Sequence, residues 1–179
     1  AFKGETLTFL TTSGPRGLPS LFTLLSECES GDDRSRVCNA IIRMGERAHP
    51  TLVNELQRPS SPWYVRRNIL FILGKLGIPG NASLYEKCLM DNDLRIQREA
   101  AITLLATCGK QAWQPIVDQA KSDTQFRFHG CMLLARSGAT LTPGLRDVVW
   151  EGVFQSFEAK AHSSGSVQWI GVLVRFREH

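Results

Sequence analysis

The chain has 179 residues, 42% of them hydrophobic and 21% charged, which is typical of a soluble globular protein and too apolar for a disordered one. This length predicts one domain or two small ones. The net charge of +4 is too small for a dedicated nucleic-acid-binding arm. No apolar run approaches the roughly 18 residues that a membrane span needs, so we expect no membrane association.

The first residues, Ala1 to Glu5, show no basic stretch followed by an apolar one, so we expect no signal peptide. Because no initiator methionine precedes them, we also expect a fragment of a longer chain. The cysteines are odd in number and lack the close pairs of a structural zinc site, so we predict no bound metal and no cofactor. We expect buried free thiols and a reducing, cytoplasmic setting. The cysteines are Cys28, Cys38, Cys88, Cys108 and Cys131.

Five glycines recur at separations of 31, 32, 32 and 29 residues: Gly14, Gly45, Gly77, Gly109 and Gly138. Apolar residues stand eight, seven, five, four and one positions before most of them, which is the stripe of an amphipathic helix. Before the fourth glycine, for example, this stripe includes Ile102, Leu104 and Leu105. A proline follows each glycine within six residues, and apolar residues follow at seven and eleven positions. Each unit is therefore predicted to be a helix, a glycine turn and a second helix.

A two-helix unit of this size cannot bury its apolar face alone, whereas stacked units share a continuous core. We therefore predict an all-α fold, an α-solenoid (superhelix) of about five two-helix repeats over residues 1–158. Residues 159–179 are expected to be a capping helix or the start of a truncated downstream segment. Residues 163–179 fit either a helix or a strand, and we favour the helix because it would cover the open apolar end of the stack.

Residues 63–77 and 93–105 resemble the first helix of a HEAT repeat. A cation stands eleven positions before each glycine. It matches the first-helix arginine of this family, which links neighbouring repeats through polar groups. These cations are Lys3, Arg34, Arg66, Arg98 and Arg127. The unit of about 32 residues is shorter than the usual ~40–47 and is similar to the short HEAT-like repeats of bacteria. The resemblance implies that Arg34, Arg66, Arg98 and Arg127 form a structural ladder.

The predicted second helices (18–30, 48–59, 79–91, 111–123 and 141–158) hold ten acidic and four basic residues, whereas the first helices hold most of the basic ones. In solenoids that this chain resembles, second helices line the concave surface. One acidic row stands nine or ten positions after the glycines and would run along successive units: Glu55, Glu86, Asp118 and Asp147. The row is either an ordinary solvated face or a docking strip for a basic segment of another protein.

The aromatic side chains allow two interpretations. Trp63 and Tyr64 are expected either to pack between repeats or to form an exposed contact, and Trp113 and Trp150 to pack on the second-helix side. His129 is expected to be a surface or ladder residue and not a metal ligand.

No catalytic constellation can be assembled from the sequence, so we predict a non-enzymatic protein-interaction scaffold in the cytoplasm. One alternative is a nucleic-acid-binding protein similar to the HEAT-like DNA glycosylases. The acidic second helices oppose it, although the basic first helices could still touch phosphates. A third possibility is an accessory subunit similar to the bilin lyases, for which no chromophore-binding residue is evident.

Overall fold

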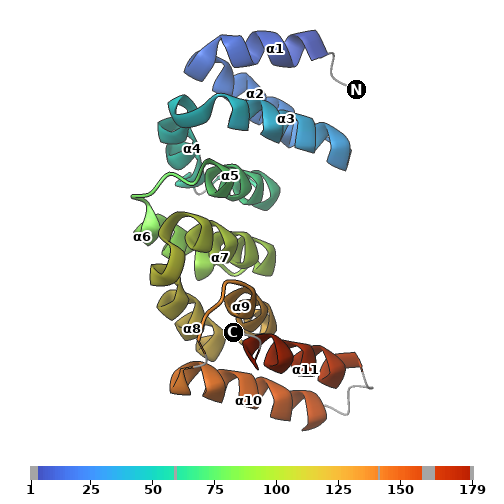
Figure 1. Ribbon diagram of the computed structural model, residues 1–179. Helices are drawn as coiled ribbons and strands as arrows, with labels where there is room; N and C mark the ends of the chain where they lie inside the picture. The colour runs from blue at the N-terminus through green and yellow to red at the C-terminus, as the bar shows by residue number, and fades with distance from the viewer. Residues whose placement is uncertain (1–3, 59, 141, 159–163, 178–179) are drawn as a thin grey trace. The chain divides into compact units, whose positions relative to one another are not determined.

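A computed structural model describes residues 4–58, 60–140, 142–158 and 164–177, and these residues form α-helices and short 3-10 helices without any strand (Figure 1). The predicted all-α class is therefore confirmed. The chain divides into two compact units, Ala1–Leu84 and Tyr85–His179, a division that the sequence pattern did not indicate. None of the described helices is both long and apolar enough to cross a membrane.

The first unit contains five complete α-helices. They are α1 (Gly4–Thr12), α2 (Leu18–Glu27), α3 (Gly31–Arg43), α4 (His49–Leu56) and α5 (Trp63–Leu76). Helix α3 lies between α1 and α5 and contacts both, while α2 and α4 pack against this row from one side (Figure 1). Leu21 and Leu25 of α2 and Leu52 and Leu56 of α4 are buried, as their spacing from the glycines predicted.

Helix α6 (Ala82–Leu89) contains the boundary between the units. The second unit continues with α7 (Leu94–Cys108), α8 (Trp113–Ser122), α9 (Thr124–Arg136), α10 (Pro143–Glu158) and α11 (Ser164–Arg177). Helix α9 is central and contacts α7, α8, α10 and α11. The helix favoured for the C-terminal segment is confirmed, and α11 buries Trp169, Val172 and Phe176.

The glycine turns are a second confirmed element. All five repeating glycines have positive φ, between 57° and 75°. Gly77 ends α5 in the left-handed conformation, which costs other residues energy because of their Cβ atom. The sequence did not predict the 3-10 turns that start at three of these glycines, η1 (Gly14–Gly17), η2 (Gly45–Ala48) and η3 (Gly109–Ala112). Because of these turns, α2, α4 and α8 each begin four residues after their glycine.

Polar breakers start the first helices of three predicted units. The Ser30 hydroxyl accepts a hydrogen bond from the Asp33 N–H at 3.0 Å, as an N-cap does. Asp93 accepts one from the Arg95 N–H at 2.9 Å, and Asp123 accepts from two N–H groups at the start of α9. These caps fix where α3, α7 and α9 begin.

The buried positions of α7 are displaced by one residue from those that the sequence predicted. Ile102, expected in the apolar stripe, is 44% exposed, whereas Thr103 and Leu104 are buried. Five buried residues of α5 have buried counterparts in α7 that lie 31 positions later, although Gly77 and Gly109 are 32 positions apart. The α5 residues are Val65, Ile69, Leu70, Ile72 and Leu73, and their α7 counterparts are Ile96, Ala100, Ala101, Thr103 and Leu104. One extra residue therefore stands between the buried face of α7 and its glycine.

Candidate functional site

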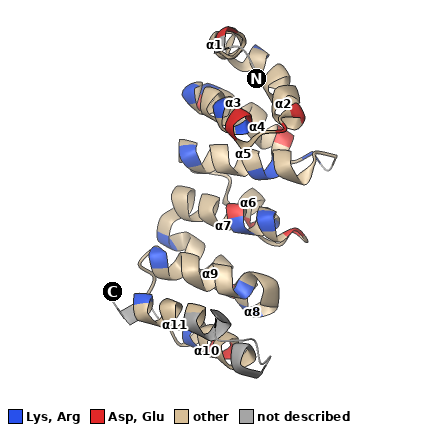
Figure 2. Ribbon diagram, turned by 90° about the vertical axis from the view of Figure 1, so that its right-hand side faces the viewer, with Lys and Arg blue, Asp and Glu red and all other residues tan. Residues whose placement is uncertain are grey.

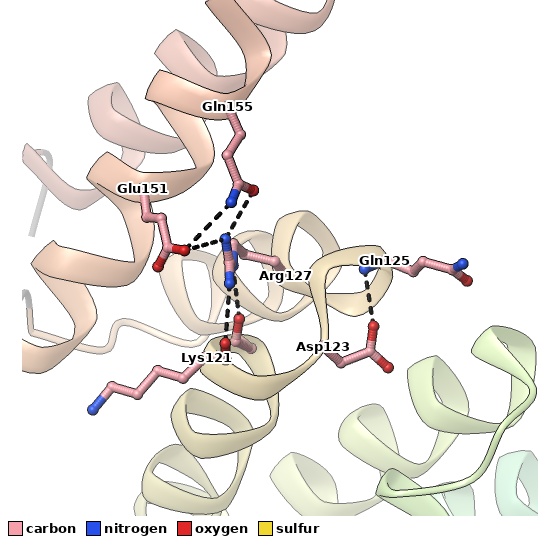
Figure 3. Close-up of polar contacts among 7 residues, drawn as sticks. Lys121, Asp123, Gln125, Arg127, Glu151 and Gln155 are labelled. Atoms are coloured by element: carbon pink, nitrogen blue, oxygen red, sulfur yellow. Dashed lines mark hydrogen bonds and ion pairs between the residues drawn. The ribbon is translucent and has the colours of Figure 1, made fainter. Parts of the chain in front are cut away.

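Arg127 on α9 lies at the centre of a polar network in the second unit (Figure 3). Its side chain is buried, with 3% of the residue exposed. The guanidinium donates to the carbonyls of Ala120 at 2.9 Å and Lys121 at 3.0 Å, at the end of α8. It also reaches α10, where it donates to Gln155 Oε1 at 2.9 Å and lies 3.1 Å from Glu151 Oε1. This residue thus joins α8, α9 and α10.

Two other members of the predicted ladder behave differently from each other. Arg34 Nη1 donates to the Cys28 carbonyl at 3.2 Å, six residues earlier, which matches the spacing from Arg127 to Lys121. Arg98 is exposed, unlike Arg127. Gln97 takes its place, since it is buried and its Nε2 donates to the Asp91 carbonyl, again six residues earlier, at 2.7 Å. Arg66 is half-buried.

The four acidic residues of the predicted row have different surroundings. Glu55 on α4 is half-buried, accepts a hydrogen bond from Ser61 Oγ at 2.7 Å and pairs with Arg58 at 2.9 Å, so its charge is largely compensated within the first unit. Glu86 on α6 is also half-buried. Asp118 on α8 and Asp147 on α10 are exposed, and these two helices contact each other.

The outer face of α10 combines carboxylates with exposed aromatic rings. Asp147, Trp150, Glu151 and Phe154 are spaced i, i+3, i+4 and i+7, so they share one helix face, and all four are exposed. Trp150 is 46% and Phe154 62% exposed, and their ring centroids are 6.1 Å apart. The sequence predicted a packed Trp150, which is wrong because α10 buries Leu145, Val148, Val149 and Val153 on its other side instead. We call these four exposed residues the α10 face.

A groove on the second-helix side of the first unit has a volume of about 440 Å³. Residues of α2 and α4 and of the chain that leads into α5 line it, among them Phe22, Thr51, Glu55 and Arg58. The polar part of its wall thus consists mainly of hydroxyl groups and of the ion pair between Glu55 and Arg58. Of the four residues in the predicted acidic row, Glu55 alone lines this groove.

Two grooves on the first-helix side of the first unit are basic. The groove between α1 and α3, about 460 Å³, is lined by Arg36 and Arg43, and the groove between α3 and α5, about 380 Å³, by Arg34 and Arg67. No acidic residue is among those lining either groove in the described part of the chain. Figure 2 shows the corresponding basic stretches on α3 and α5.

The remaining aromatic and histidine side chains make local contacts. Trp63, 39% exposed, meets Tyr64 edge-on at 5.7 Å, and Trp113 is half-buried with Lys110 Nζ 5.7 Å from its ring centroid. Burial and the nearby charge of Arg98 lower the pKa of His129.

The cysteines are free thiols; Cys108 is half-buried, and the other four are buried. Burial raises the pKa of Cys38 to about 11 and that of Cys131 to about 12. Among residues 4–58, 60–140, 142–158 and 164–177, no three His, Cys, Asp or Glu side chains cluster closely enough to hold a metal ion.

No protein-family model matches the chain, and no curated protein matches it.

Proposed function

We propose that the chain is an α-solenoid of short HEAT-like repeats that acts as a non-catalytic scaffold and binds a basic segment of another protein. The recurrence of buried positions supports the repeat architecture. Cys38, Leu70, Ala101 and Cys131 are all buried and follow one another at intervals of 32, 31 and 30 residues. Within each unit, consecutive first helices also lie in contact, since α3 touches α1 and α5, and α9 touches α7. Such nearest-neighbour stacking is the basis of solenoid stability.

The α10 face is the observation that carries the binding proposal. Tryptophan and phenylalanine are enriched at protein interfaces, and their exposure here leaves apolar surface in water. The carboxylate of Asp147 lies on the same face as the rings, and Asp118 stands on the neighbouring helix. Glu151 also lies on this face, but it pairs with Arg127. An arginine or lysine side chain could place its charge beside the carboxylates of Asp118 and Asp147 and over the Trp150 ring at once. The free thiols are compatible with a reducing, cytoplasmic compartment.

The test is the binding of a short labelled peptide in which arginine alternates with leucine, followed by fluorescence anisotropy. Trp150→Ala is expected to weaken binding about fivefold, because one cation–π contact contributes about 1 kcal/mol. Combining Asp118→Lys with Asp147→Lys is expected to weaken it at least about tenfold through like-charge repulsion.

The matched control is Glu46→Lys, an exposed acid of η2 in the first unit, together with Trp63→Ala. Both controls should leave the affinity unchanged. If the peptide does not bind, or if the α10-face variants bind it as well as the wild type, the scaffold proposal fails.

A second candidate function is the binding of a nucleic-acid backbone on the first-helix side of the first unit. The two basic grooves beside α3 favour it, because they offer arginine side chains without an acidic residue among the lining residues described. A labelled duplex should then bind at low salt and dissociate as salt rises, and Arg36→Glu with Arg43→Glu should abolish binding. No binding of the duplex at low salt would exclude this candidate.

A further inference from the structure

A polar groove of about 530 Å³ lies in the second unit, beside the turns that follow α6 and α8. Its wall includes the carboxylates of Asp91 and Asp123 and the side-chain amides of Gln97, Gln119 and Gln125. Met90, which is 65% exposed, adds an apolar edge. None of the described residues that line the groove is a lysine or an arginine. The groove wall therefore presents carboxylates and other hydrogen-bond acceptors.

Gln97, which lines this groove, carries an acceptor without a donor. The residue is 4% exposed, and its Nε2 donates to the Asp91 carbonyl and to Asp123 Oδ2, both at 2.7 Å. Because both of these partners are acceptors, the amide nitrogen must face them and the orientation of the amide is fixed. Gln97 Oε1 is then buried without a donor, which is unfavourable unless a bound group supplies one.

Arg127 shows what the equivalent position holds one predicted repeat later, 30 residues along the chain. There a guanidinium donates to two carbonyls at the end of α8 and to Gln155, and it pairs with Glu151. At position 97 the side chain is shorter and neutral, so it reaches the Asp91 carbonyl but brings no positive charge. Position 97 is thus surrounded by acceptors as Arg127 is, but its own side chain carries no positive charge.

The Asp123 carboxylate is held in its charged form. Burial opposes its ionisation, but hydrogen bonds from Gln97, from the N–H groups of Phe126 and Gln125, and from Gln119 outweigh burial and lower its pKa. Each of its two oxygens already accepts two of these bonds. The negative charge of Asp123 would therefore attract an incoming cation, and the cation would donate its hydrogen bond to Gln97 Oε1.

We propose that this groove is a subsite for an arginine side chain of the partner's basic segment. An arginine fits because its guanidinium carries several N–H donors and no acceptor, and because its methylene stem can lie along Met90. The subsite deepens the proposed scaffold function and rests on it for the identity of the partner.

The experiment follows the side-chain amide resonances of Gln97 and Gln119 by NMR while N-acetyl-arginine amide is added to the whole chain. The citrulline analogue is the matched probe, since it keeps the shape and loses the charge, and the lysine analogue tests for the guanidinium. We expect saturable shifts at millimolar concentration with arginine, and at least about tenfold weaker effects with citrulline and lysine.

Two variants locate the subsite. Gln97→Arg brings its own guanidinium, as Arg127 does, so it should abolish the shifts at Gln119 and keep or raise the melting temperature. Asp91→Asn, which preserves the shape and removes one charge, should weaken binding severalfold. Gln114→Arg, on the exposed surface of α8 and outside the groove lining, is the control and should bind as the wild type does.

The subsite is overturned if arginine produces no saturable shift, if citrulline or lysine binds equally well, or if Gln97→Arg still binds. These outcomes are separable from those of the scaffold test. Peptide binding that depends on Trp150 but not on Gln97 keeps the scaffold and removes the subsite. Saturable arginine binding at Gln97 without peptide binding on the α10 face keeps the subsite and removes the scaffold proposal.

Discussion

Arg127 on α9 and Glu151 on α10 lie 3.1 Å apart, yet the side chain of Arg127 is only 4% exposed while that of Glu151 is 54% exposed. A half-solvated ion pair contributes little to stability, because water screens it. The carbonyls of Ala120 and Lys121 are different, since they end a helix and depend on the guanidinium for hydrogen bonds. The stabilising effect of Arg127 therefore lies mainly in its contacts with α8.

We expect Arg127→Met to lower the free energy of unfolding by about 2–3 kcal/mol, because it removes charge-assisted hydrogen bonds and leaves carbonyls without donors. Glu151→Gln should cost less than about 1 kcal/mol. Urea unfolding followed by circular dichroism measures both. Arg98→Met is the control, and it should change stability by less than about 0.5 kcal/mol because Arg98 is exposed. Equal losses for the two arginine variants would contradict the assignment of the ladder position.

The contrast between Arg98 and Gln97 shows where periodicity failed. Counting back from the glycines assumes that every first helix is equally long. Helix α7 has fifteen residues, one more than α5, and its buried face is set by packing and not by the distance to Gly109. Arg98, the cation at the predicted position, is therefore exposed, and the neighbouring Gln97 is buried instead. The extra residue becomes visible only when the buried positions of α5 and α7 are compared.

The candidate site was less predictable than the fold. Apolar spacing and positive-φ glycines are local properties, so the helix pairs and their turns could be inferred from the sequence. Exposure of Trp150 depends on which side of α10 meets its neighbours, and the orphan acceptor of Gln97 depends on distances between three separate segments. The acidic row was predicted from residue positions alone. Those positions could not show that Arg58 pairs with Glu55 and that Ser61 donates a hydrogen bond to it.

The left-handed turn at Gly77 predicts a stability difference between two glycines. Gly77 has φ of +64°, so Gly77→Ala should lower the free energy of unfolding by about 1–2 kcal/mol through backbone strain. Gly31, the first residue of α3, is not among the glycines with positive φ, and a Cβ there would meet open space. Gly31→Ala should be neutral or slightly stabilising. Thermal unfolding of the two variants makes the comparison, and equal effects would refute the role of the turn.

Burial of the thiols predicts a loss of stability at alkaline pH. The pKa of Cys131 rises from its ordinary value of 9.0 to about 12 because burial disfavours the thiolate. Above pH 9 the unfolded chain releases this proton while the folded chain retains it, so stability is complete below pH 9 and falls as pH rises towards 12. The contribution amounts to about 2 kcal/mol between pH 9 and about pH 10.5.

Cys131→Ala removes that titration. Its free energy of unfolding should start lower, because a small cavity forms, and should then fall less steeply with pH than that of the wild type. Urea unfolding at several pH values above 8 gives the two slopes. Identical slopes would show that the Cys131 thiol does not remain protonated in the folded state.

Helix α11 is held against α10 by a close approach between Gly152 and Trp169. A Cβ built on Gly152 would overlap the indole ring of Trp169, which is itself buried and lies edge-on to Phe128 at 5.3 Å. Gly152→Ala should therefore force the ring or the helix to shift and cost about 1–3 kcal/mol. Gly171 on α11 offers the matched control, because a Cβ there meets open space and alanine favours the helix. We expect Gly171→Ala to keep or slightly raise stability, and Gly152→Ala to shift the tryptophan emission to the red as the indole becomes hydrated. If both variants unfold at the wild-type denaturant concentration, the contact between α10 and α11 does not contribute to the stability of the second unit.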